Sequence, residues 1–211
     1  MLYNLKKLLT NKGVKCHNII NIYKYAMGVF LMRVISGIAK GRVLKTTESY
    51  DVRPTSDLIK GAIFNAIQFD VEGRRVLDLF AGSGQMGIEA LSRGAKSATF
   101  VDSSAESVKY IRQNLKTTGF TEQSTVRITD AQSFLNSNSD IFDIAFLDPP
   151  YSKNLLQEIL PKLTEFISPY GMIFCEHDKS DVLPDSVNDF TKVKEYRHGR
   201  ILVSLYKRGT E

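Results

Sequence analysis

The chain has 211 residues, of which 43% are hydrophobic and 24% charged, and its 28 Lys and Arg against 23 Asp and Glu give a net charge of +5. This composition excludes a fibrous or disordered chain and suffices for one α/β domain with a full core, while no apolar run approaches the ~20 residues of a membrane span. Two cysteines, Cys16 and Cys175, and three histidines without CxxC or HxxxH spacing argue against a disulfide framework or a metal site and favour a cytoplasmic protein.

Residues 1–31 differ from the rest of the chain. They hold five lysines with no arginine and no acid, whereas residues 32–211 carry 23 basic and 23 acidic side chains. Because the segment also lacks a hydrophobic period, we predict an N-terminal extension outside the fold and a single domain over 32–211, with Met32 as a candidate start. An organellar transit peptide is the alternative interpretation, although the arginines and serines typical of such peptides are missing.

Residues 32–70 are predicted to form a small hairpin followed by a helix. The hairpin turns between Gly37 and Gly41, which separate two short apolar stretches. Apolar residues then recur at helical spacing over about 57–68, behind Thr55-Ser-Asp57 as a candidate N-cap.

Residues 71–211 alternate between strand and helix patterns. Apolar runs predict strands over 75–80, 97–101, 124–128, 142–147 and 172–176. Helical patterns fill the intervals, over 84–93, 104–117, about 131–135 and 154–167. Such repeats predict a Rossmann-like α/β core with a mostly parallel sheet that binds ligands at the carboxyl ends of its strands. A closing antiparallel hairpin is expected from the alternation over 190–196 and 200–206.

A glycine-rich turn follows the first strand of this core. Gly82, Gly84 and Gly87 match GxGxxG between a strand and a helix, a pattern that lets the backbone approach a ligand closely. The match fits a dinucleotide enzyme as well as a methyltransferase. The candidate cofactor contacts in this turn are Phe80, Ala81, Gly82, Ser83 and Gly84.

Three acids near strand ends are further candidates for cofactor binding. Asp102, followed by Ser103, ends the second strand and can accept hydrogen bonds from ribose hydroxyls, or else cap the next helix. Asp130 can accept from an adenine amino group, with Ala131 leaving space beside the ring. Asp78 lies in an apolar strand, where it accepts from loop amides and, through water, faces the charged amino group of a ligand; a purely structural role is the alternative.

The tetrapeptide Asp148-Pro149-Pro150-Tyr151 ends the fourth strand and indicates the chemistry. Two prolines form a rigid corner and leave carbonyls free to accept. The Asp148 carboxylate and the Pro149 carbonyl can each accept one N–H of a base amine, which aims the nitrogen lone pair at a methyl donor, S-adenosylmethionine. Tyr151 would stack on a base taken out of its helix. The alternative is a proline-rich surface turn capped by the aspartate.

These motifs together resemble the class I methyltransferases, and more closely the bacterial ribosomal RNA small subunit methyltransferase D family. The likeness covers about 32–207. It rests on Arg33-Val-Ile-Ser-Gly37 with Gly41-Arg42, on Arg53-Pro-Thr-Ser-Asp57, on Asp78-Leu-Phe-Ala-Gly-Ser-Gly84, on Gly87-Ile-Glu-Ala-Leu-Ser-Arg93 and on Asp148-Pro-Pro-Tyr151. The resemblance implies a seven-stranded sheet whose last strand is antiparallel. It further implies S-adenosylmethionine as cofactor and the N2 amine of a guanine in 16S ribosomal RNA, free or in an assembling small subunit, as target.

Basic residues gather at the two ends of the predicted domain. Residues 32–60 hold six basic against three acidic side chains, residues 192–208 six against one, and residues 61–191 eleven against eighteen. If the ends meet in space they form a basic lip suited to a phosphate backbone, whereas the alternative is a solvated surface with chance asymmetry. The candidate RNA contacts are Arg33, Lys40, Arg42, Arg53, Arg197 and Arg200. Arg53 could instead pin the first helix through a carboxylate.

Three other functions remain open at this point. A DNA adenine-N6 methyltransferase would use the same chemistry, but such enzymes usually add a target-recognition segment for which the 180 residues from Met32 leave little room. An NAD-dependent oxidoreductase would use the glycine turn and Asp102 but gives Asp148-Pro-Pro-Tyr151 no role. A non-catalytic RNA-binding protein on the same fold would not need an intact site. Nothing in the sequence requires an oligomer, and nothing indicates a membrane partner.

Overall fold

The computed structural model describes residues 32–46, 57–150 and 154–209. The chain divides into two compact units, Met1–Met32 and Arg33–Glu211, and only the second is described at length. The predicted extension over 1–31 and the predicted N-cap at Thr55-Ser56 lie outside the described residues. In the part of the chain that is described, no helix is long and apolar enough to cross a membrane.

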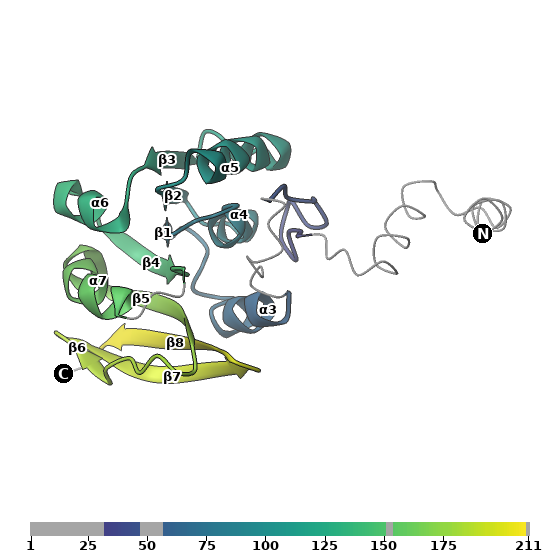
Figure 1. The fold of residues 1–211 in the computed structure, drawn as a ribbon. Coiled ribbons are helices and arrows are strands. Elements are labelled where there is room, and N and C mark those ends of the chain that lie inside the picture. The colour runs from purple at the N-terminus through teal and green to yellow at the C-terminus, as the bar shows by residue number, and fades with distance from the viewer. Residues whose placement is uncertain (1–31, 47–56, 151–153, 210–211) are drawn as a thin grey trace, which may run out of the picture. The chain divides into compact units, whose positions relative to one another are not determined.

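One mixed sheet of eight strands, in the order β3-β2-β1-β4-β5-β8-β7-β6, forms the centre of the second unit (Figure 1). The strands are β1 (Arg75–Leu79), β2 (Ser97–Asp102), β3 (Ser124–Ile128), β4 (Phe142–Leu147), β5 (Ile167–Asp178), β6 (Ser186–Val187), β7 (Phe190–His198) and β8 (Ile201–Arg208). Strands β1 to β5 are parallel, and β8 is antiparallel to both β5 and β7. The Rossmann-like architecture and the antiparallel last strand are therefore confirmed. The expected count of seven was wrong by one, because β6 has two residues and no period that a sequence pattern could reveal.

Helices cover both faces of this sheet, with α3, α4 and α5 on one side and α6 and α7 on the other (Figure 1). They are α3 (Asp57–Ala66), α4 (Gln85–Ser92), α5 (Ala105–Thr118), α6 (Ala131–Ser137) and α7 (Leu155–Leu163), followed by a short 3₁₀ helix, η1 (Thr164–Phe166). Helix α5 begins at the Ser104 N-cap and ends at Gly119, whose φ of 84° is left-handed and favours glycine. Helix α7 ends before the predicted boundary because η1 tightens its last turn and β5 begins early, at Ile167.

The alternation of side chains along the strands divides the core between the two helical layers. Leu147 and Cys175, which are paired between β4 and β5, belong to the cluster packed under α6 and α7. One residue earlier, Phe146 stacks on Phe174 with ring centroids 5.5 Å apart, and Phe146 also meets Phe64 of α3 at 5.4 Å. Residues of β4 and β5 that continue the Phe146 and Phe174 rows thus face the α3 side.

The predicted hairpin is confirmed as a small loop closed by one antiparallel bridge between Arg33 and Val43. The fully buried carboxylate of Glu89 in α4 holds it by accepting from the backbone amides of Ile35 (2.7 Å) and Ser36 (3.0 Å). Gly37 turns against α4 so closely that a Cβ there would lie 1.7 Å from a backbone oxygen, with φ at 79°. The hairpin is therefore anchored along α4.

A buried lysine joins this hairpin to the helix that follows it. The ammonium of Lys60 in α3 donates to the Arg33 carbonyl at 2.7 Å and lies 3.9 Å from the Asp57 carboxylate. Burial lowers the pKa of Lys60, an effect that the nearby carboxylates of Glu89 and Asp57 oppose. The contact fixes α3 against the hairpin.

Candidate functional site

The glycine turn after β1 has the backbone that its glycines require. Gly82 and Gly84 have φ values of 54° and 77°, and Phe80 has 74° although it is not glycine. A Cβ at Gly82 would meet nothing within 4 Å, so the space above it is open. At Gly87 a Cβ would lie 2.4 Å from the Phe100 ring, so this glycine lets α4 pack on β2. Of the three glycines, Gly82 is the one that faces open space and Gly87 serves packing.

Hydrogen bonds tie this turn to the end of β2. The amides of Phe80 and Ala81 both donate to the Val101 carbonyl, at 3.0 and 2.9 Å. The half-buried Asp102 carboxylate accepts from the Gly82 amide (2.8 Å) and, through its other oxygen, from the Ser104 amide (2.8 Å). Each carboxylate oxygen has two lone pairs, so Asp102 keeps capacity for two further donors. The cap of α5 is Ser104 itself, next to the exposed Ser103.

Asp130, the candidate acid after β3, lies next to the end of β2. Asp130 caps α6 by accepting from the Ser133 amide at 2.8 Å, and that bond lowers the pKa of its carboxyl. Its side chain is exposed, whereas Ala131 is buried. The preceding Thr129 amide donates to the Asp102 carbonyl (3.1 Å), so the ends of β2 and β3 are held together.

Asp78 is a buried carboxyl group beneath the turn. It is 4% exposed, and it accepts from the Gly87 amide at 2.9 Å. Burial raises its pKa to about 8; the Gly87 hydrogen bond opposes this shift, and the charges of Asp148 and Asp102 add to it. The buried Asp78 carboxyl therefore senses the charges of both Asp148 and Asp102 at this edge of the sheet.

The Asp148-Pro-Pro corner lies where β4 ends, next to an open cleft of about 430 Å³. Asp148 is exposed at this corner, Pro149 is buried and Pro150 is exposed, while Tyr151 lies outside the described residues. The cleft is lined by Pro149 and Pro150, by Asn154, Leu156 and Gln157 at the start of α7, and by residues from the end of β5 and the loop that follows, which are Glu176, His177, Ser180, Asp181, Val182 and Leu183. Such a concave space with a few polar groups suits an aromatic base.

The edge at β1 and β2 also fits S-adenosylmethionine as the expected cofactor. Gln85, in the first turn of α4, has a buried Oε1 with no partner among the described residues. Helix α4 has no side-chain cap at its N-terminus, which begins at Gly84. Together with the open space at Gly82 and the remaining acceptor capacity of Asp102, these features suit a nucleoside that also carries charged groups.

An asparagine that the sequence reasoning missed holds the glycine turn in place. Asn114 of α5 is buried and donates from Nδ2 to the Ser83 carbonyl (2.9 Å) and the Lys45 carbonyl (2.8 Å). Its Oδ1 accepts from the Lys45 amide at 2.7 Å. The signal available in the sequence was a polar residue three positions after Ile111, on the apolar face of a helix.

Two of the basic candidates lie at the same edge of the sheet as the cleft. Arg197 and Arg200, both exposed, flank the turn between β7 and β8. Arg200 binds the Asp178 carboxylate at 3.3 Å, and its carbonyl accepts from the Lys179 amide at 2.8 Å. The turn is thus joined to the loop that walls the cleft.

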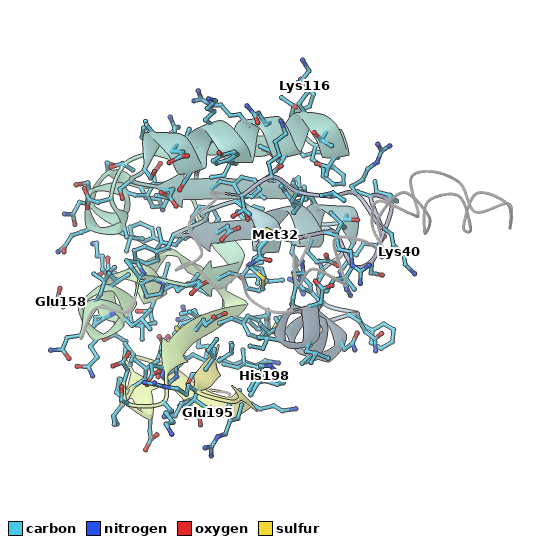
Figure 2. All side chains as sticks on the ribbon, turned by 45° about the vertical axis from the view of Figure 1, so that its right-hand side comes forward. Met32, Lys40, Lys116, Glu158, Glu195 and His198 are labelled. Atoms are coloured by element: carbon cyan, nitrogen blue, oxygen red, sulfur yellow. The ribbon has the colours of Figure 1, made fainter. Side chains whose placement is uncertain are left out.

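The other basic candidates do not join them in one lip. Lys40 and Arg42 belong to the hairpin, whose turn bonds to Ser92 at the last residue of α4, the end away from the glycine turn. Lys40 and His198 accordingly project from separate regions of the domain (Figure 2). Arg33 binds Asp57 at 3.1 Å and so pins α3, the role considered for Arg53, which lies outside the described residues. Among the described residues no group of three His, Cys, Asp or Glu could hold a metal ion.

Residues 32–207 match the family described as Conserved hypothetical protein 95. The chain belongs to this family. YlbH of Bacillus subtilis is 40% identical over 182 residues, which are 84% of this chain and 99% of YlbH. Ribosomal RNA small subunit methyltransferase D of Haemophilus influenzae is 35% identical over 181 residues, covering 83% of this chain and 93% of that protein. The solved structure of yhhF from Escherichia coli has a TM-score of 0.78 at 29% identity and covers 86% of this chain and 100% of that one.

These relatives confirm the resemblance that the motifs predicted. This Conserved hypothetical protein 95 member is a methyltransferase with the expected Rossmann-like fold. The NAD-dependent alternative explained only the glycine turn and Asp102, both of which a methyltransferase also uses.

Proposed function

We propose that the chain transfers a methyl group from S-adenosylmethionine to the exocyclic N2 amine of a guanine in 16S ribosomal RNA. The observation that carries this proposal is the Asp148-Pro149-Pro150 corner beside the cleft, one strand away from the glycine turn after β1. The substrate is supported by the relative named ribosomal RNA small subunit methyltransferase D. The choice of an exocyclic amine as the methylated group rests on the chemistry of the Asp148-Pro149-Pro150 corner.

The cofactor is assigned to the edge formed by β1, β2 and β3. When bound, it supplies an electrophilic methyl group on a sulfonium. Asp102 accepts from the ribose hydroxyls, with Ser103 alongside, and Asp130 and Ala131 flank the adenine. The backbone of Phe80, Ala81, Gly82, Ser83 and Gly84 lines the remaining length, where the open space at Gly82 allows close approach. Asp78 faces the charged amino group from below.

The base amine is assigned to the β4 corner. A guanine amine is a poor nucleophile because its lone pair is delocalised into the ring. The Asp148 carboxylate accepts one N–H and the Pro149 carbonyl the other, which holds both hydrogens out of the ring plane and directs the lone pair at the methyl carbon. After transfer the nitrogen is acidic, and its proton leaves through Asp148 or water. Pro150 keeps the corner rigid, and Tyr151 stacks on the base.

Two separate basic regions are assigned to the RNA backbone. Arg197 and Arg200 lie beside the cleft and would hold phosphates near the flipped nucleotide. Lys40 and Arg42 lie along α4 and would contact a more distant part of a folded RNA. Arg33 and Arg53 are the remaining proposed contacts to the RNA backbone.

The test is transfer of tritiated methyl from S-adenosylmethionine to small ribosomal subunits and to naked 16S RNA from a strain that lacks this enzyme. We expect one site labelled, with N2-methylguanosine as product, and no label with Asp148→Ala. Asp140→Ala is the matched control, because Asp140 is exposed just before the opposite end of β4. N6-methyladenine in added DNA instead would support the adenine alternative and overturn the guanine assignment.

A further inference from the structure

The carboxylate assigned to the target amine and the cleft lie on opposite faces of the sheet. Asp148 follows Phe146 by two residues, and the Phe146 ring lies 5.4 Å from that of Phe64 in α3. The Asp148 charge also helps to raise the pKa of buried Asp78, whose carboxyl accepts from the Gly87 amide of α4. Both observations place the Asp148 carboxylate on the side of α3 and α4.

The cleft, in contrast, belongs to the side of α6 and α7. Leu156 of α7 and Leu183 of the loop after β5 line it. Both are members of the core cluster that contains Leu147 and Cys175 and packs under α6 and α7. The Pro149-Pro150 corner also lines the cleft, so the cleft lies across this corner from the target amine. Its volume of about 430 Å³ gives room for a second base.

Hydrogen bonds between the elements around this cleft hold its walls in place. The Gln157 side chain of α7 donates to the Val182 carbonyl at 2.7 Å, which ties the helix to the loop after β5. The buried ring of His177 bonds through Nε2 to the Ser204 hydroxyl of β8 at 2.9 Å. Because the protein's own contacts fix both walls, the cleft is preformed, as ligand sites usually are.

The side chains that line the cleft suit the two faces and the edge of a base. Val182 is apolar and 79% exposed, and Pro150 is also exposed, so both can cover the face of a flat ring. Among the described residues, the Asp181 carboxylate and the Asn154 amide take part in no hydrogen bond or ion pair. These two groups therefore keep their capacity for the polar edge of a base.

The basic turn beside the cleft identifies RNA as the source of this base. Arg200 binds Asp178 at 3.3 Å and its carbonyl accepts from the Lys179 amide, so the turn that also carries Arg197 is joined to the loop that lines the cleft. Cations beside a base-sized cleft match a nucleotide whose phosphate lies outside and whose base lies inside. Proteins commonly read single-stranded RNA through such unstacked bases.

We infer that the cleft between α7 and the loop after β5 binds the base of a nucleotide that directly flanks the target guanine in the RNA. The target amine is held on the other side of the Pro149-Pro150 corner. The inference rests on the proposed function and adds a second base-binding subsite to it. The enzyme thus takes an RNA segment in which two consecutive bases leave the stack and separate around the corner.

The first experiment compares methylation of intact 16S RNA with RNAs that are abasic at the 5′ or at the 3′ neighbour of the labelled guanine. A base stacked in a protein site is worth about tenfold or more in affinity. We expect kcat/KM for one of the two abasic RNAs to fall at least about tenfold, mainly through KM, with N2-methylguanosine still formed at saturating RNA.

Two outcomes of this comparison separate the inference from the proposed function. If both abasic RNAs are methylated as efficiently as intact RNA, the inference is overturned and the proposed function stands. If the wild-type enzyme methylates none of the three RNAs, the proposed function fails and the inference fails with it.

A variant that fills the cleft locates the subsite. Ser180→Trp places a large side chain in the cleft, and Ser186→Trp is the matched control, because Ser186 is an exposed serine of β6 outside the cleft lining. We expect Ser180→Trp to lower kcat/KM for intact RNA at least about tenfold and to remove the difference between intact and abasic RNA. Ser186→Trp should keep both wild-type values, and the calorimetric affinity for S-adenosylmethionine should be unchanged in both variants.

Loss of methyl transfer by Ser180→Trp even at saturating RNA would mean that the cleft holds the target base itself, and would overturn the inference. Photocrosslinking of the wild-type enzyme covers the case in which this variant fails to fold. With 4-thiouridine at the neighbouring position that the abasic RNAs identify, we expect attachment within residues 154–157 or 176–183, mapped by mass spectrometry. Attachment only to other parts of the protein would contradict the assignment of the cleft.

Discussion

Two regions at the carboxyl ends of the parallel strands, one at β1 and β2 and the other at β4 and β5, are built in different ways. At β1 and β2 the contacts are local backbone bonds, such as those from the Gly82 and Ser104 amides to Asp102, and the segments involved follow each other closely in sequence. At β4 and β5 the site depends on segments that are distant in sequence, such as the Pro149-Pro150 corner and the loop after β5 that line the same cleft, and on the turn joined through Arg200 to Asp178. The first half suits a cofactor of constant shape, and the second suits a target read by its hydrogen-bonding edge.

The largest effect is expected at the target half. Asp148→Ala removes an acceptor for the base amine, so kcat should fall by about 10²–10³-fold, the cost typical of losing one oriented polar contact in a transition state. The affinity for S-adenosylmethionine should stay within a few-fold. Single-turnover methylation and calorimetric binding together check this. A large loss of cofactor affinity would mean that Asp148 belongs to the cofactor half at β1 and β2, and would contradict its assignment to the target base.

Asp102→Ala should show the reverse pattern. It removes the acceptor for the ribose hydroxyls, and the lost charge-assisted hydrogen bonds should weaken S-adenosylmethionine binding by about 10–100-fold. The methyl-transfer rate at saturating cofactor should change much less. Calorimetry with Asp140→Ala as a control measures the effect, and an unchanged dissociation constant would sink the ribose assignment.

A smaller effect is expected from the basic turn beside the cleft. Arg197→Ala with Arg200→Ala should weaken RNA binding several-fold and reduce the slope of log affinity against log salt by about one to two. Lys96→Ala, at the amino end of β2, is the matched control. Filter binding at several salt concentrations gives both slopes. Equal slopes in the variant and the wild type would remove this turn from the RNA-binding surface.

The smallest effect concerns stability and comes from Asp78. Its pKa is raised to about 8 by burial, so the native state keeps a proton that the unfolded chain loses near the ordinary value of 3.8. Between these two values the native state binds more protons, and stability therefore falls as pH rises. Asp78→Asn removes the titration and can still accept from the Gly87 amide. Its Tm relative to the wild type, both without cofactor, should be higher at pH 8 than at pH 5, by a few degrees.

If that difference in Tm is the same at both pH values, Asp78 is ionised in the native protein. The burial of that charge and its repulsion by Asp148 and Asp102 would then need another source of compensation.

The local half of the site was predictable from the sequence because its contacts are short-range. The glycine turn, the Ser104 and Gly119 ends of α5 and the strands β3 and β4 all follow from residue types within a few positions. Strand β6 and the early start of β5 were missed because two residues carry no period and Pro169-Tyr-Gly171 looks like a loop.

The rest depends on contacts between distant segments. The side chain of Asn114 joins α5 to Ser83 and Lys45, which are far away in the chain. The hairpin that carries Lys40 and Arg42 packs against Ser92 at the end of α4 away from the glycine turn, whereas Arg197 and Arg200 lie beside the loop after β5. Charge counts cannot reveal such separation, because they carry no information on which end of a helix a loop packs against.

The central claim is that the Asp148 corner methylates the N2 amine of guanine. It is tested most directly by nucleoside mass spectrometry of 16S RNA after incubation with S-adenosylmethionine and either the wild-type enzyme or Asp148→Ala. The account predicts N2-methylguanosine at a single position with the wild type and none above background with the variant. A methylated adenine as the product, or equal N2-methylguanosine with both enzymes, would contradict it.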